Sequence, residues 1–103
     1  MTVPKVVRDG NVAVVVSPGF GAGWSTWAQD LGAEAAAFAP DVVAWIEAGK
    51  PADGEEALKR YGYTGGLADT EIVWLPVGTR FQINEYDGSE SIEILTPDWG
   101  FTA

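Results

Sequence analysis

An α+β fold is predicted for this chain by the order of its sequence patterns. Strand-like runs lie at both ends, and Asp-Gly turn signals, Asp9-Gly10 and Asp87-Gly88, separate runs in each half. The segment between them is rich in alanine and has helical periodicity. Strands grouped apart from helices are typical of an antiparallel sheet that carries its helices on one face. At 103 residues the chain is expected to form a single acidic domain, residues 1–103, because it is long enough for one core.

The first strands are predicted at Val3–Val7 and Val12–Val16, which are rich in β-branched residues. Asp9-Gly10 between them favours a tight hairpin turn, because glycine tolerates a positive φ. The second run is continuously apolar instead of alternating, which predicts a strand covered on both faces. We therefore expect Val12–Val16 at the centre of a sheet.

Three helical segments are predicted in the middle of the chain. Asp30–Phe38 is alanine-rich, although Gly32 weakens it. Pro40 to about Ala48 has proline in the first turn and Gly49 as a C-terminal stop. Its apolar stripe is Val42, Val43, Trp45 and Ile46. A third helix is predicted from Asp53, which has capping-box spacing and would bury Ala57, Leu58 and Tyr61.

A three-stranded antiparallel unit is predicted near the C-terminus, at Glu71–Leu75, Thr79–Tyr86 and Ser91–Leu95. Alternation places Phe81 and Ile83 on one face of the middle strand, and Ile92 and Ile94 together on the next one. Glu93 would be exposed. Trp99 and Phe101 in the tail are expected to dock on the sheet.

The charge balance and the missing residue types restrict the function. Six Lys and Arg residues oppose fifteen Asp and Glu residues, so the net charge is −9. A negative field of this size repels nucleic acid and anionic membranes and attracts basic protein surfaces. The chain has no His and no Cys, which removes the commonest catalytic bases, nucleophiles and transition-metal ligands. We expect no enzyme activity, no catalytic residues and no cofactor.

The expected location is the cytoplasm. The first residues, Met1 to Lys5, are not followed by the long apolar stretch of a signal peptide. The longest apolar run, Val12–Val16, is too short to span a bilayer.

A glycine-rich, aromatic segment, Ser17–Trp27, follows the predicted central strand. Its position between a strand and a helix resembles that of a phosphate-binding loop, but no lysine is present and Trp24 stands where a dinucleotide fingerprint needs glycine. One interpretation is a tight turn whose tryptophans pack in the core. The alternatives are a small-ligand site at Gly19, Gly21 and Gly23, or a loop that presents Trp24 and Trp27 as partner anchors.

The second predicted hairpin tip, residues 84–90, gathers carboxylates. Glu85, Asp87 and Glu90 lie around it, and Glu93 follows on the returning strand. A solvated turn is one interpretation, and a Ca²⁺ or Mg²⁺ site is another, although the spacing is not that of an EF-hand loop. The interpretation favoured here is an acidic patch that pairs with Lys and Arg of a protein partner, and no metal site is predicted.

Two blocks of the chain resemble a family of small, mostly uncharacterised proteins encoded by bacteriophages and prophages. The first block runs from Val6 through Arg8-Asp9-Gly10 and Ser17-Pro18-Gly19-Phe20-Gly21-Ala22-Gly23-Trp24 to Trp27. The second comprises Tyr63–Gly66 and Glu71–Glu90. Together they cover about half of the chain, and the resemblance implies a phage accessory protein.

This resemblance makes the negative charge interpretable. Small acidic phage proteins include inhibitors of host defence, anti-CRISPR proteins among them, which occupy basic nucleic-acid-binding surfaces. We therefore expect an inhibitor of a bacterial defence system whose partner is a defence protein or ribonucleoprotein with a basic surface. It would act in the cytoplasm of the infected host, without binding nucleic acid or membrane directly. The alternatives are a sponge-like nucleotide-binding protein and a phage structural or assembly protein, and the oligomeric state is left open.

Overall fold

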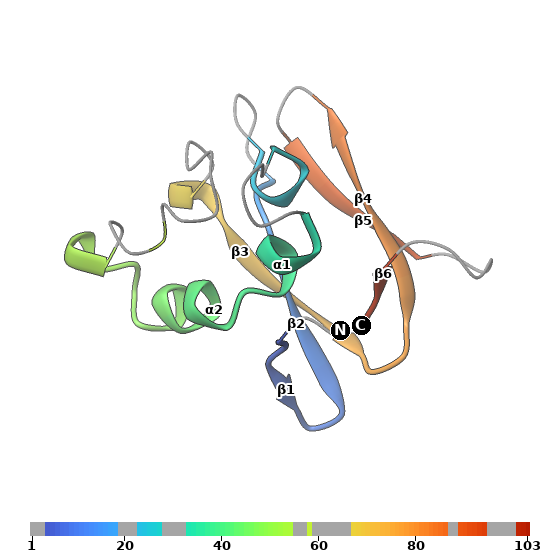
Figure 1. Cartoon of the computed structure of the whole chain (residues 1–103). Helices are drawn as coiled ribbons and strands as arrows, with labels where there is room; N and C mark the ends of the chain where they lie inside the picture. The colour runs from blue at the N-terminus through green and yellow to red at the C-terminus, as the bar shows by residue number, and fades with distance from the viewer. Residues whose placement is uncertain are drawn as a thin grey trace.

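The computed structural model describes residues 4–18, 23–27, 33–54, 58, 67–86, 89–94 and 101–103. The predicted α+β class is confirmed, with strands at both ends of the chain and helices between them (Figure 1). The strands are β1 (Val7–Arg8), β2 (Asn11–Val16), β3 (Glu71–Pro76), β4 (Arg80–Tyr86), β5 (Ser89–Ile94) and β6 (Phe101–Thr102). The helices are α1 (Ala33–Phe38) and α2 (Pro40–Glu47), with the short 3-10 turns η1 (Ser25–Trp27), η2 (Ala52–Gly54) and η4 (Leu67–Asp69).

The first sheet has the order β1-β2-β3 and is antiparallel throughout. Asp9 and Gly10 join β1 to β2 with φ values of 51° and 79°. Two successive positive φ values are those of a type I′ turn, which matches the natural twist of a hairpin. The prediction that Val12–Val16 forms a central strand is confirmed, since β2 pairs with β1 on one edge and with β3 on the other.

The second sheet has the order β5-β4-β6, which differs from the three-stranded unit expected for the C-terminal half. Glu71–Leu75 does form a strand, but β3 pairs with β2, with Val14 opposite Val73. The third strand beside β4 is β6, because the tail returns to pair Phe101 with Phe81. Gly78, at φ 92°, turns the chain between β3 and β4 and donates to the Ala103 carbonyl at 2.6 Å.

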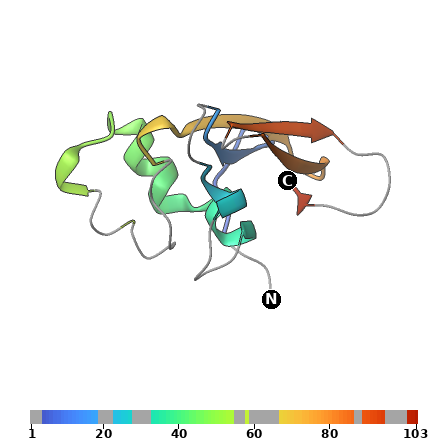
Figure 2. The same cartoon turned by 90° about the horizontal axis from the view of Figure 1, so that it is seen from above.

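The continuous apolar character of β2 is consistent with β4 forming a second sheet instead of extending the first one. Ala13 and Val15 face a core formed with the helices and Trp24, while Val12, Val14 and Val16 face Phe81. All five residues are at most 3% exposed. A strand that is apolar on both faces needs a covering layer on each. The second sheet, together with Phe38 of α1, covers one face, and the other packs against further residues of α1 and against α2. Figure 2 shows the two helices together on the same side of β3.

The predicted helix from Pro40 is confirmed as α2, which buries Val42, Val43 and Trp45. Gly49 follows it at φ 90°, as expected for a residue that ends a helix. The helix predicted over Asp30–Phe38 is described only from Ala33. Of the third, Ala52–Gly54 is a 3-10 turn and Leu58 is helical and buried, while Ala57 and Tyr61 lie outside the described residues. Within the described ranges no helix is long and apolar enough to cross a membrane.

The burial of β2 predicts a large difference between two valine truncations. Val14 is 0% exposed and Val77 is 58% exposed. We expect Val14→Ala to lower the free energy of unfolding by about 2 kcal/mol, because it removes buried methyl groups and leaves a cavity. Val77→Ala is the matched control and should change it by less than about 0.5 kcal/mol. Urea unfolding followed by tryptophan fluorescence measures both, and equal effects would contradict the two-sided core.

Candidate functional site

The Glu90 side chain is buried and binds the glycine-rich segment instead of facing solvent. It is 2% exposed. Its Oε1 accepts a hydrogen bond from the Ser17 backbone N–H at 2.9 Å. Its Oε2 accepts from the backbone N–H groups of Trp24 at 2.8 Å and Thr26 at 3.0 Å, and from Thr26 Oγ1 at 2.5 Å. A carboxylate that receives this many donors is satisfied in a buried place.

The two sheets meet at these hydrogen bonds from Ser17, Trp24 and Thr26 to Glu90, which we call the Glu90 cradle. The Glu90 backbone N–H donates to the Ser17 carbonyl at 2.8 Å, so the chain just after β2 runs beside the start of β5. Ser89 Oγ extends the contact by donating to the Pro18 carbonyl at 2.6 Å. Glu90 therefore joins the second sheet to the segment that leads into η1.

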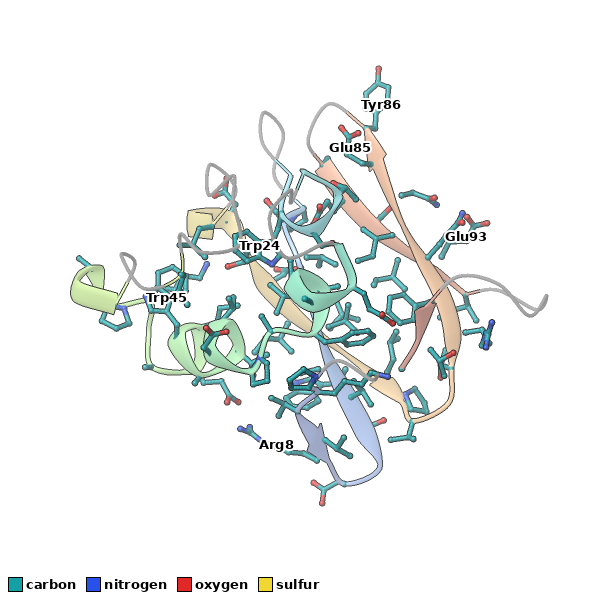
Figure 3. All side chains as sticks on the ribbon, in the orientation of Figure 1. Arg8, Trp24, Trp45, Glu85, Tyr86 and Glu93 are labelled. Carbon is teal, nitrogen blue, oxygen red and sulfur yellow. The ribbon has the colours of Figure 1, made fainter. Side chains whose placement is uncertain are left out.

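The favoured patch of Glu85, Asp87, Glu90 and Glu93 needs correction at Glu90. Alternation explains the burial, because Glu90 shares a face of β5 with Ile92, which packs in the core. Glu85 and Glu93 are exposed, but they lie on opposite faces of the second sheet, since Glu85 pairs with Glu90 and Glu93 pairs with Gln82. Asp87 lies outside the described residues. Among the described members, the carboxylates do not gather on one surface (Figure 3).

The structure corrects one prediction for the glycine-rich segment and leaves others outside the described residues. Trp24 is 0% exposed and donates from Nε1 to the Ala36 carbonyl at 2.9 Å, so it packs in the core and is not a surface anchor. Gly23 is buried, while Gly19 and Gly21 lie outside the described residues. The side chain of Trp27 is likewise not described, and its anchor role stays a prediction. The backbone donors that could have held a ligand anion, at Ser17, Trp24 and Thr26, hold Glu90 instead.

A polar cluster occupies the outer face of the second sheet. Gln82 Nε2 donates to Asn84 Oδ1 at 3.0 Å and to Glu93 Oε1 at 2.6 Å. Asn84 Nδ2 also donates to Glu93 Oε1, at 2.9 Å. The hydrogen bonds from Asn84 and then Gln82 lower the pKa of Glu93, because they stabilise its charged form. Tyr86 shares this face by alternation and is 78% exposed (Figure 3).

A second surface cluster joins the first hairpin to α2. The Arg8 guanidinium binds the Glu47 carboxylate in a two-point ion pair, with Nη2 to Oε1 at 2.7 Å. It also lies 5.5 Å from the centre of the Trp74 ring. The hydrogen bond from Arg8 lowers the pKa of Glu47, and Glu47 raises that of Arg8. Both groups are solvated, so the pair adds little stability.

The exposed charge of the described surface is almost entirely negative. Among the described basic residues only Arg8 is exposed, since Lys5, Lys50 and Arg80 are half-buried, and Arg8 is paired with Glu47. Lys5 is half-buried, donates to the Thr102 carbonyl at 2.7 Å and lies 4.7 Å from the Phe38 ring centre. The exposed described carboxylates are Asp9, Glu34, Glu47, Asp69, Glu71, Glu85 and Glu93. No group of three or more Asp or Glu residues within the described ranges is placed to hold a metal ion.

Three features of the site were not predicted from the sequence, and two of them had a signal in it. The period-two pattern that put Ile92 and Ile94 on the inner face also puts Glu90 there. The approach of Gln82 and Asn84 to Glu93 depends on the β4–β5 register, which the hairpin turn indicates. The contact of Arg8 with Glu47 had no local signal, because it joins segments distant in the chain.

The chain matches no protein-family model, no curated protein and no solved structure. No residue role comes to it from a relative.

The Glu90 cradle predicts a strong effect of an isosteric change. Glu90→Gln keeps the shape but replaces one acceptor oxygen with an amide donor that faces other donors. We expect the free energy of unfolding to fall by about 3 kcal/mol. The control Glu71→Gln, at an exposed position of β3, should change it by less than about 0.5 kcal/mol. Chemical denaturation measures both, and a Glu90→Gln midpoint equal to that of the control would contradict the cradle.

The amide cluster predicts an acid shift of the Glu93 titration. We expect the Glu93 carboxyl to titrate below the ordinary glutamate value of about 4.3, and Asn84→Ala to move it upward. Since the folded-state pKa is the lower one, the stabilisation is present above the unfolded pKa and is lost as pH falls through the folded pKa. Carboxyl ¹³C shifts followed against pH measure this. An unchanged Glu93 midpoint in Asn84→Ala would contradict the assignment.

Proposed function

We propose that this protein is a phage-encoded inhibitor of a bacterial defence system, and that it binds a basic, nucleic-acid-binding surface of a host protein through its acidic surface. The CRISPR effector complexes are the class of partner that we put first. The observation that carries the proposal is the one-sided charge of the described surface, where exposed carboxylates face solvent and the one exposed base, Arg8, is neutralised by Glu47.

The charge favours this class of function for a physical reason. A protein surface that binds nucleic acid is lined with Lys and Arg, which hold the phosphates by long-range attraction. A rigid negative surface is attracted to the same residues and competes for them. The exposed carboxylates within the described residues are carried on a folded scaffold with a buried core, so little ordering entropy would be lost when this surface binds.

Because Trp24 is buried, other apolar side chains would have to slow dissociation of the partner protein. The expected anchor Trp24 lies in the core. Exposed apolar side chains are found instead at Val7, Trp74, Val77, Tyr86 and Ile94. Tyr86, at the end of β4, lies on the same face of the second sheet as Glu93, whereas its sequence neighbour Glu85 points to the opposite face. An exposed aromatic ring on an acidic surface is suited to a partner rich in arginine, because guanidinium groups stack on aromatic faces.

The proposal predicts competition with nucleic acid. A purified CRISPR effector ribonucleoprotein should lose target-DNA binding as the protein is added, and the inhibition should weaken between about 50 and about 500 mM salt, where charge attraction is screened. Electrophoretic mobility of labelled DNA measures this, with a neutral protein of similar size as the control. Failure to bind the effector or to displace DNA at low salt, across the effector types tested, would contradict the proposal.

A further inference from the structure

We infer that the outer face of the second sheet is an arginine-binding subsite, formed by Glu93, Gln82 and Asn84 with Tyr86 farther along β4. The inference rests on the proposed function and makes it more specific, because it names the surface and the side chain that the partner would supply. The occupant is an arginine of a basic protein surface.

The hydrogen bonds inside the cluster leave it rich in acceptors. Both amide N–H groups of Gln82 are used, one on Asn84 Oδ1 and one on Glu93 Oε1. Asn84 also spends an amide N–H on Glu93 Oε1. No described residue donates to Gln82 Oε1 or to Glu93 Oε2. Three of the four amide N–H groups are therefore used inside the cluster, which leaves one Asn84 N–H against the oxygens Gln82 Oε1 and Glu93 Oε2. A surface with this excess of acceptors favours a ligand made of donors, and the guanidinium group has five of them and no acceptor.

The carboxylate is both charged and fixed in place. Its two amide donors come from the neighbouring strand, at Gln82 directly opposite and at Asn84 on the same face. Because β4 is hydrogen-bonded to β5 and β6 on its two sides, the strand that carries the donors is held. A preorganised carboxylate loses less side-chain entropy on pairing than a free surface glutamate does.

Tyr86 extends the subsite along the strand. Alternation places it on the same face as Gln82 and Asn84, and its side chain is exposed. It lies four residues after Gln82, which is roughly 14 Å along the strand at about 3.4 Å per residue. A partner segment with two basic residues at a similar spacing could place one guanidinium on Glu93 and another over the ring. In Figure 3, Glu93 and Tyr86 both point away from the body of the molecule.

The experiment compares an oligo-arginine and an oligo-lysine peptide of equal length, with affinity measured by isothermal titration calorimetry at low salt. We expect the wild type to prefer oligo-arginine by about threefold, since a guanidinium engages two acceptors together whereas an ammonium acts as a point charge. Amide NMR shifts on adding oligo-arginine should concentrate at residues 82, 84, 86 and 93.

Glu93→Gln should lower the oligo-arginine affinity by about fivefold and remove the preference over lysine. Glu71→Gln is the matched control, because it removes the same charge from another exposed strand position, and its loss should stay below about twofold. Asn84→Ala keeps the charge of Glu93 but releases it, so it should reduce the arginine preference without removing binding. The thermal midpoint of each variant confirms that it is folded.

The outcomes separate this inference from the proposed function. Equal losses in Glu93→Gln and Glu71→Gln, with no preference for arginine, would overturn the subsite and leave an acidic inhibitor that acts by its overall field. If the wild type and Glu93→Gln displace DNA from an effector equally well, the subsite is likewise overturned and the acidic inhibitor remains. If neither peptide binds the wild type at low salt, the subsite is overturned directly, while the DNA competition decides the proposed function.

Discussion

The contact on which the arrangement of the two sheets depends is the buried carboxylate of Glu90. It receives backbone N–H groups from Ser17, Trp24 and Thr26, together with the Thr26 hydroxyl. These donors belong to the segment between β2 and α1, whereas Glu90 belongs to β5. One side chain thus fixes the exit of the central strand, the turn η1 and the edge of the second sheet. A charge in this position is stable because these donors reach it, and loss of the carboxylate would remove the acceptor of the buried Ser17 and Trp24 N–H groups.

The same contact explains why the described part of the glycine-rich segment does not offer its backbone N–H groups to a ligand. Such segments bind anions because their backbone N–H groups converge. Here the converging groups that are described already bind an anion, and it belongs to the chain itself. Backbone N–H groups of such a segment can therefore bind either the anion of a ligand or a carboxylate of the same chain. In this protein the described N–H groups bind the Glu90 carboxylate.

The exposed carboxylates that the structure describes include some that are held by other side chains and some that are only solvated. Glu93 is held by two amides on the outer face of the second sheet, and Glu47 of α2 is held by Arg8 of the first hairpin. Glu34 and Glu71 are exposed on α1 and β3. Overall charge sets the range and speed of attraction to a basic partner, whereas the held carboxylates and the exposed Tyr86 give such a surface a shape that a particular partner side chain recognises.

The α+β class, the central place of β2, the helix from Pro40 and the turn at Asp9-Gly10 could be predicted from the sequence, because each depends on local periodicity or on backbone conformation. The net negative charge and the lack of histidine and cysteine are likewise properties of the sequence. The pairing of β3 with β2, the burial of Trp24 and the hydrogen bonds of the Glu90 carboxylate to the backbone depend on long-range contacts and could not be predicted from local patterns. Alternation assigns a residue to a face, but what that face meets depends on segments far apart in the chain. Ser17 and Glu90 are brought together by folding alone, and that meeting turned a predicted surface acid into part of the core.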